Sequence, residues 1–357
     1  TALELDDGVC VRSGLLANLF QSMEVRINGV VVSRCTDSVA QVDALLHRST
    51  KSKTWLESIG AAVNFYGDDD FARQAATASD GLVIGSTAQT DARCVSEFEL
   101  LWDLAPLSLF RSENNIPPGC DIELVLNPYG GTQYQNNAIQ SPAAKIAGTD
   151  FAFSVESMVM YAKVYEGRRY DNGTAILDLT NVNCHTEVGP FHNFAQKTFD
   201  VSPSTHMLTV AWQDDRQTDS THSASDFVCN GVTRDELKLN RMFIAYDGQQ
   251  HPQPDADPGF VAGVDRTVQR YVETQQAIGA YDSESGGETL RQWHERGAYY
   301  SFKWDRDGAS AATCAVVHSQ FSAALANSRM LLFDHSYANC KLQFVNGRCV
   351  AVTVENA

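Results

Sequence analysis

Residues 340–354 read CKLQFVNGRCVAVTV, and this stretch decides the fold class. Apolar residues occupy alternate positions on both sides of Asn346-Gly347, which is the period of a β-strand with one buried face. Asn-Gly tolerates the two positive-φ positions of a tight type I′ turn, so the stretch predicts a β-hairpin. MEVRINGVVVS at 23–33 has the same design, and Asp247-Gly248 follows the strand-like LKLNRMFIAY at 237–246.

The rest of the chain is also dominated by period-two patterns. Alternating apolar residues predict strands over 98–104, 122–126, 208–212 and 300–304, and residues 151–165 form one long β-prone stretch. Many short strands with turn residues between them are typical of β-sandwiches and barrels.

Helical spacing is rare. A helix predicted after Ser38 as its N-cap carries three apolar residues at i, i+3, i+4 spacing: Val42, Leu45 and Leu46. A second helix is predicted from about Asp265, with these residues on one face: Val264, Val268, Tyr271 and Val272. A further short turn is predicted at Leu290 and Trp293.

Charge and hydropathy argue against two classes of partner. The 357 residues include 44 acidic and 27 basic side chains, which gives a formal net charge of −17. Such a surface repels phosphate, so direct nucleic-acid binding is not expected. No apolar run approaches the roughly 18 residues of a membrane span, and the first residues lack a signal-peptide pattern.

The cysteine pattern indicates thiols rather than a disulfide framework or a zinc ribbon. The nine cysteines are an odd number, and no two are spaced as C-x-x-C; they are residues 10, 35, 94, 120, 184, 229, 314, 340 and 349. Several cysteines lie in apolar runs, as Cys314 and Cys349 do. We therefore expect the cysteines to be small buried hydrophobic residues of a protein in a reducing compartment. The Asn172-Gly173-Thr174 sequon is expected to be unused there.

Motifs that could carry chemistry are weak. Cys184, His185 and His192 lack the spacing of a structural zinc site, and Asp68–Asp70 and Asp255–Asp257 lack the pattern of an EF-hand loop. Walker, dinucleotide-binding and nucleophile-elbow motifs are absent from the sequence. A pair of carboxylates for sugar hydrolysis stays an open possibility, because the sequence does not give their separation in space. The sequence therefore predicts no catalytic, cofactor-binding or metal-ligating residue.

The order of the predicted elements repeats along the chain. In each half a strand ends at an Asn-Gly or Asp-Gly turn and is followed by a helix, a polar excursion, a strand ending in Trp-Asp and an aliphatic strand. A chance arrangement of generic β elements and a duplicated sandwich both explain this order. A duplicated sandwich places the domains at 1–148 and 149–357.

Five stretches carry a resemblance to a known family. They are LLANLFQSMEVRINGVVVS (15–33), FELLWDLAPLSLFRSENNIPPGCDIELVLNP (98–128), VESMVMYAKVYEG (155–167), ELKLNRMFIAYDGQQHP (236–252) and VVHSQFSAALANSRMLLFDHSYANCKLQFVNGRCVAV (316–352). In this order they resemble the double jelly-roll major capsid proteins of polintons, polinton-like viruses and virophage-like elements. In such proteins strands precede the segment resembling 15–33, so we expect either residues upstream of Thr1 or a reduced first jelly roll.

The resemblance implies an all-β fold of two tandem antiparallel eight-stranded jelly-roll sandwiches, with a few short helices in connecting loops. It implies a non-enzymatic major capsid protein of a double-stranded DNA virus or virus-like element. Homotrimers would form pseudo-hexagonal capsomers that tile an icosahedral shell. Expected partners are the protein itself, penton proteins and minor capsid proteins, and the expected location is the virion capsid, assembled inside the host cell.

The resemblance further implies which loops could form the outer surface: 65–95, 127–148, 213–236 and 280–290. Three other functions stay open. A vertex or other minor capsid protein would have a single jelly roll. A carbohydrate-binding β-sandwich could stack sugars on Trp102, Trp212, Trp293 or Trp304, although their apolar neighbours favour core positions for most of them. A β-sandwich glycosidase would use pairs of Asp or Glu.

Overall fold

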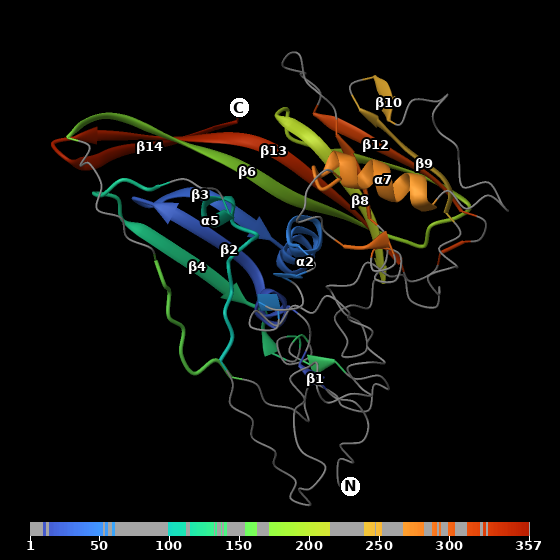
Figure 1. Ribbon diagram of the computed structural model, residues 1–357, viewed down its shortest axis with the longest axis horizontal. Coiled ribbons are helices and arrows are strands. Elements are labelled where there is room, and N and C mark those ends of the chain that lie inside the picture. The colour runs from blue at the N-terminus through green and yellow to red at the C-terminus, as the bar shows by residue number, and fades with distance from the viewer. Residues whose placement is uncertain are drawn as a thin grey trace, which may run out of the picture.

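The chain is largely built from antiparallel β-sheets (Figure 1). The computed structural model describes residues 10–11, 14–52, 54–55, 59–60, 99–111, 115–131, 133, 137, 139–140, 154–162, 171–214, 239–246, 248–251, 267–281, 288–290, 293, 299–303, 313–321, 324–325 and 328–356. Within these ranges no helix is long and apolar enough to cross a membrane.

Eight strands of the second half form nested antiparallel pairs. In chain order they are β6 (Asn172–Val188), β7 (Phe194–Asp200), β8 (Thr205–Asp214), β9 (Leu239–Tyr246), β10 (Gln249–His251), β11 (Tyr299–Lys303), β12 (Cys314–Phe321) and β13 (Ser328–Val345). The first pairs with the eighth, the second with the seventh, the third with the sixth and the fourth with the fifth. This nesting is a long hairpin rolled up on itself, which is the topology of a jelly roll.

Two further pairings complete the sheets of this sandwich. β13 also pairs with β8, and β12 also pairs with β9. The sheets therefore run β6-β13-β8-β11 and β7-β12-β9-β10. Trp212 of β8 reaches across the interior, where its ring lies 5.9 Å from that of Phe321 of β12 in an edge-to-face arrangement.

The strands β6 and β13 extend well beyond the sandwich. β14 (Arg348–Asn356) pairs with the last part of β13, after the predicted turn in which Asn346 and Gly347 have φ of 51° and 75°. This confirms the hairpin predicted over 340–354. We call the extended parts of β6 and β13 together with β14 the arm.

The first half contributes a smaller sheet that lies beside the arm (Figure 1). Its order is β3 (Val30–Thr36), β2 (Phe20–Ile27), β4 (Ile122–Pro128), and β2 and β3 join at the predicted turn of Asn28 and Gly29. Met23, Val25 and Ile27 of β2 are fully buried. A separate pair joins β1 (Cys10–Val11) to β5 (Ile139–Gln140).

The two halves share a strand order. β3-β2-β4 matches β10-β9-β12, because in each set the central strand pairs with the next strand after a tight turn and with a later strand. A helix follows the turn-linked pair in both halves: α2 (Val39–Thr50) and α7 (Thr267–Ala277). The boundary at residues 148 and 149 stays a prediction, since both residues lie outside the described ranges.

The predicted helices form, with two corrections. Ser38 is the N-cap residue of α2, but its side chain makes no capping hydrogen bond. The fully buried residues of α7 are Arg270, Thr274 and Gln275. Of the predicted apolar face, Tyr271 packs against the core, but Val268 is exposed and Val264 lies outside the described residues, so the prediction is only partly correct. Hydrogen bonding favours the polar face, because Thr274 Oγ1 accepts a bond from the Ser301 backbone N–H of β11. Two short helices, α1 (Leu15–Leu19) and α5 (Ser108–Arg111), belong to the first half.

Two predicted strands are wrong where the structure describes them. Residues 99–104 form no strand, and Leu104 has a φ of 55°, which a ladder position does not allow. Residues 154–162 also form no strand, and all nine are exposed. The second jelly roll therefore opens with β6 at Asn172 rather than near 155. Strands at 122–126, 208–212 and 300–303 are confirmed.

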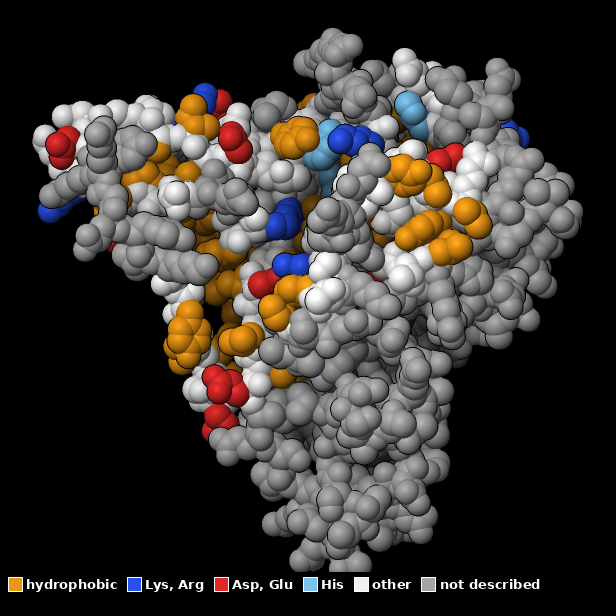
Figure 2. All heavy atoms as spheres, in the orientation of Figure 1, with side chains coloured by type: hydrophobic (Ala, Val, Ile, Leu, Met, Phe, Trp, Pro, Cys, Tyr) orange, Lys and Arg blue, Asp and Glu red, His pale blue; other side chains and the backbone are white. Residues whose placement is uncertain are grey.

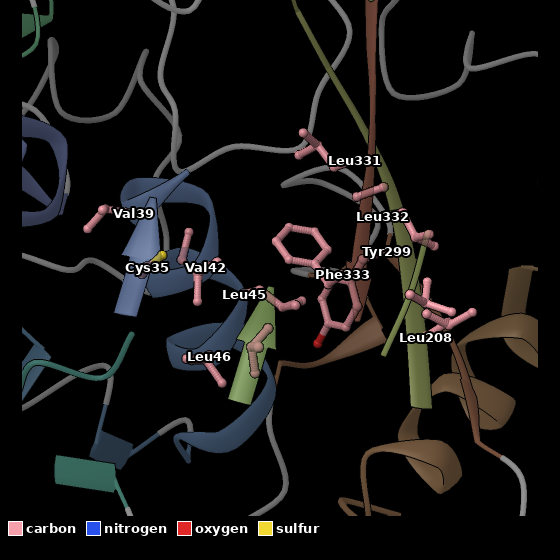
Figure 3. Packing of buried hydrophobic residues seen from close by; sticks show 14 of the residues in the cluster. Cys35, Val39, Val42, Leu45, Leu46, Leu208, Tyr299, Leu331, Leu332 and Phe333 are labelled. Carbon is pink, nitrogen blue, oxygen red and sulfur yellow. The ribbon is translucent and has the colours of Figure 1, made fainter. Parts of the chain in front are cut away.

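One hydrophobic core connects the halves (Figure 3). Leu45 of α2 points toward the rings of Phe333 and Tyr299, which project from β13 and β11. The sheet of β13, β8 and β11 is therefore covered on one face by its partner sheet and on the other by α2. Residues of β8 are buried on both faces, as a central layer requires.

Candidate functional site

A buried ion-pair cluster fastens the 102–103 segment to α2. Asp43 and His47 are four residues apart on one face of α2, and Lys51 follows as its C-cap residue. His47 Nδ1 lies 3.2 Å from Asp43 Oδ2, and Nε2 lies 3.4 Å from Asp103 Oδ1, an ion-pair distance rather than a short hydrogen bond. Lys51 Nζ lies 3.1 Å from Asp103 Oδ2, and Trp102 Nε1 donates to Asp43 Oδ1 at 3.0 Å. We call Asp43, His47, Lys51 and Asp103 the His47 cluster.

The electrostatics of the His47 cluster keep the imidazole charged. Burial disfavours the imidazolium, but Asp43 and Asp103 outweigh burial and raise the pKa of His47 to about 10. Burial also disfavours the Asp103 carboxylate, yet His47 and Lys51 hold its pKa well below the usual range. Two cations therefore balance two carboxylates. Because the His47 side chain is only 1% exposed, solvent-borne substrate cannot reach its ring.

Three residues of the His47 cluster also carry atoms that can bind a metal ion. Among the described residues, Asp43, His47 and Asp103 form a group of possible ligands whose atoms lie within 4.8 Å of one another. Lys51 and Trp102 already occupy carboxylate oxygens of this group, and each ring nitrogen of His47 faces a carboxylate. The group fits an ion-pair network better than a cation, so the absence of a metal site stays a prediction.

Sequence reasoning missed this cluster although part of its signal was visible. The spacing of Asp43, His47 and Lys51 can be read in the sequence. Asp103 could not be added to them, because the alternating pattern at 98–104 predicted a strand. The polar contacts of Trp102 and Asp103 with α2 hold this segment in a different conformation.

A second buried ion pair joins the two halves. Arg48 of α2 donates through Nε to Glu288 Oε1 at 2.6 Å and through Nη2 to Glu288 Oε2 at 2.9 Å, and both side chains are fully buried. The Arg48 guanidinium also lies over the Tyr299 ring, 5.1 Å from its centroid. A bidentate pair of this kind fixes geometry as well as charge, so it sets the position of α2 against the second-half sheet.

The candidates weighed from the sequence do not assemble into a metal site where they are described. Cys184 and His185 are neighbours in β6, so their side chains point to opposite faces of the sheet, and His192 lies on the exposed stretch before β7. Asp68–Asp70 and Asp255–Asp257 lie outside the described residues. Asn172 of the sequon begins β6, and its side-chain oxygen accepts a hydrogen bond from the Asn346 N–H.

The tryptophans do not offer a sugar-stacking surface in the described part of the chain. Trp212 and Trp293 are buried in the core, and Trp102 is partly buried against it. Trp304 lies outside the described residues. The cysteine prediction is mixed, since Cys35, Cys340 and Cys349 are buried but Cys314 is exposed.

An exposed apolar segment is the clearest surface feature. Residues 154–162 are drawn as a tube rather than an arrow (Figure 1), and five large apolar side chains in it are between 40% and 77% exposed: Val155, Met158, Val159, Met160 and Tyr161. All five side chains are exposed, so the apolar surface of this segment is uncovered in the single chain. Exposed hydrophobic side chains also gather at several places on the face drawn in Figure 2. Contiguous exposed apolar surface is typical of contacts between proteins.

Comparison with solved structures identifies the fold. The chain is similar to the mavirus major capsid protein, with 11% identity and a TM-score of 0.52 over 100% of this chain and 80% of that chain. It is also similar to the PBCV-1 virus capsid (10% identity, TM-score 0.45, 98% and 88% covered) and to the Sputnik virophage structure (9%, 0.42, 100% and 78%). No protein-family profile matches the chain, and no curated protein matches it in sequence.

The mavirus likeness, together with the nested strand pairs, shows that the expected fold is correct. The chain is mostly β, its sheets are antiparallel, and it has the double jelly-roll fold of a major capsid protein. The likeness at this identity concerns the fold, because one fold can support several functions.

Proposed function

We propose that this protein is a major capsid protein of a double-stranded DNA virus or virus-like element. The observation that carries the proposal is the complete jelly roll of β6 to β13 beside a second sheet with the same strand order, in a chain that shares the fold of the mavirus major capsid protein. A jelly roll packs two sheets face to face into a stiff block with its loops at the ends. A stiff block of this kind suits a structural role in a shell better than a catalytic role.

Two blocks in each chain give a simple route to a six-sided tile. Three copies around a threefold axis place six blocks in a ring, and closed cyclic symmetry is a common solution for identical chains. The buried Arg48–Glu288 pair and the shared core support this route, since both hold the halves of one chain in a fixed arrangement. The tiles then pack edge to edge into an icosahedral shell.

The apolar segment 154–162 supports assembly with further copies of the chain. Its apolar side chains are uncovered in the single chain, and burying them against the next copy would give a contact with an apolar centre, as stable oligomers have. We propose that this segment lies in the contact between copies within the trimer. Contacts between tiles, and contacts with penton and minor capsid proteins, complete the proposed shell.

The proposed location is the virion, and the proposed role is structural rather than enzymatic. The net charge of −17 keeps separate tiles soluble and opposes their premature clumping. The His47 cluster is closed to substrate, which agrees with a structural role for this strongly perturbed histidine.

The mass and shape of the purified protein test this proposal. Light scattering coupled to size-exclusion chromatography should give three times the chain mass at micromolar concentration, and negative-stain images should show hexagonal particles. A monomer over this range, a fivefold oligomer or particles without sixfold outline would each contradict the proposal. The fivefold result would favour a vertex protein.

A further inference from the structure

Three turns from distant parts of the chain meet around Cys120. The Asn28 N–H donates to the Asp121 carbonyl at 2.9 Å, and the Asp121 N–H donates to Asn28 Oδ1 at 2.8 Å. Asn28 Nδ2 also donates to the Cys349 carbonyl at 2.8 Å, and the Cys349 N–H donates to the Gly119 carbonyl at 3.1 Å. The residues before and after Cys120 are therefore fixed to the β2–β3 turn and to the start of β14.

The side chains of Cys120 and Cys349 meet at this junction. The Cys349 thiol lies close enough to Cys120 to contribute to the raised pKa of that residue. Cys349 Sγ also donates to the Ala351 carbonyl at 3.6 Å. Both thiols are free, Cys349 is buried and Cys120 is half-buried, so a small reagent can reach the pair from the side of Cys120.

We propose that Cys120 and Cys349 form a redox-controlled staple, a disulfide that closes when the protein meets a small-molecule disulfide such as oxidised glutathione. A disulfide requires Cα atoms roughly 4.4–6.8 Å apart, and the hydrogen bond from the Cys349 N–H to the residue next to Cys120 provides this kind of backbone proximity. The staple would join the first-half sheet to the arm. This inference does not depend on the proposed capsid function.

The chemistry balances through thiol–disulfide exchange. The Cys120 thiolate attacks one sulfur of oxidised glutathione, a bond forms between them, and the glutathione S–S bond breaks to release one glutathione thiolate. The Cys349 thiolate then attacks the Cys120 sulfur and releases the second glutathione. Two protein thiols are oxidised to one disulfide, one glutathione disulfide is reduced to two thiols, and the two protein protons pass to the released glutathione.

The surroundings predict that this exchange is slow at neutral pH. Burial, followed by the proximity of Cys349, raises the pKa of Cys120 to about 12. Because the thiolate is the nucleophile, the rate should rise about tenfold per pH unit well below that pKa. The staple would accordingly stay open in a reducing cell and close after prolonged exposure to an oxidising medium.

Peptide mapping of the intact protein tests the staple directly. The purified full chain is incubated with oxidised glutathione at pH 7.0, 8.0 and 9.0, the remaining thiols are alkylated, and the unreduced digest is examined by mass spectrometry. We expect a peptide pair linked through Cys120 and Cys349, formed faster at each higher pH. We also expect the Tm to rise by about 5–10 °C, because the crosslink closes a long loop, and to return after reduction.

The chain offers its own controls. The exposed Cys314 has no cysteine partner in its described surroundings and should become a mixed disulfide with glutathione, which shows that the oxidant acts. Cys340 is buried in β13 near Cys349 and is therefore the competing partner. Because the proposed staple does not use Cys340, a Cys340→Ser variant should still form it. Cys120→Ser and Cys349→Ser should abolish both the linked peptide and the Tm rise. Two results with the wild-type protein would each overturn the proposal. In the first, Cys314 is modified while Cys120 and Cys349 stay free; in the second, Cys120 or Cys349 is linked to Cys340.

Discussion

His47 shows how a single buried residue can couple stability to pH. Its pKa is about 10 in the folded chain and 6.5 ordinarily. A raised pKa means that the stabilising contribution is complete below pH 6.5 and is lost as the pH rises through 10. We therefore expect the free energy of unfolding to fall between pH 7 and pH 10. We further expect His47→Gln to lower it by about 2 kcal/mol at pH 7, because the buried Asp43 and the half-buried Asp103 lose the cation between them, although Trp102 and Lys51 still contact them.

Urea unfolding followed by tryptophan fluorescence at several pH values measures this effect. His318→Gln is the matched control, because burial lowers the pKa of His318 and its loss should leave the alkaline fall unchanged. The interpretation fails if His47→Gln keeps the full alkaline fall of the wild type.

The Arg48–Glu288 pair provides a second residue-scale prediction. Both side chains are fully buried, so Arg48→Met or Glu288→Leu alone should cost about 3–5 kcal/mol, because each removes the partner of a buried charge. The double variant Arg48→Met with Glu288→Leu should recover most of this loss, since no uncompensated charge remains. Denaturant unfolding of the four proteins gives the coupling energy. Additive losses would contradict the buried-pair interpretation.

Gly119 allows a cleanly controlled prediction about the backbone. It has a φ of 92°, and an added Cβ would lie 2.5 Å from the Gly347 carbonyl oxygen. Gly119→Ala should therefore destabilise the protein by about 2 kcal/mol, through strain and a backbone clash. Gly130→Ala is the control, because a Cβ there meets nothing within 4 Å. Equal Tm values for the two variants would show that the junction is not tight.

At the scale of elements, local sequence patterns predict a strand pair correctly where the two strands are adjacent in sequence. The Asn28-Gly29 and Asn346-Gly347 hairpins follow from residues that are adjacent along the chain. The alternation at 98–104 fails because a strand also needs an edge to pair with, and Trp102 and Asp103 instead bond to α2. The predicted apolar face of α7 fails in part for a similar reason, since Thr274 bonds to β11 and Arg270 pairs with Glu273 of the same helix.

At the scale of the whole molecule, the fold class follows from the sequence but the connections do not. Many short alternating strands indicate sandwiches, and the family resemblance adds the double jelly roll. The nested pairing of β6 with β13 joins residues far apart in sequence, and no local pattern encodes it. The His47 cluster and the Arg48–Glu288 pair were also out of reach, because each joins residues from segments that only the folded chain brings together.

The exposed segment 154–162 links the single chain to its proposed assembly. If its apolar side chains are buried between copies, two adjacent charges should weaken that contact without disturbing the fold of a chain in which these side chains touch solvent. We expect Val159→Asp with Met160→Asp to shift the protein from trimer toward monomer and to raise the dissociation constant at least 100-fold. Light scattering over a concentration series measures the shift.

The control for this experiment places charge on another exposed apolar position. Val350 of β14 is 59% exposed, close to the 69% of Val159 and 52% of Met160, so Val350→Asp adds charge at similar exposure outside the segment. It should leave the oligomer intact, and thermal unfolding should show that all variants are folded. If the segment variants remain trimers, 154–162 is not the contact, whereas a wild-type monomer would reject the assembly itself. The two results separate the position of the interface from its existence.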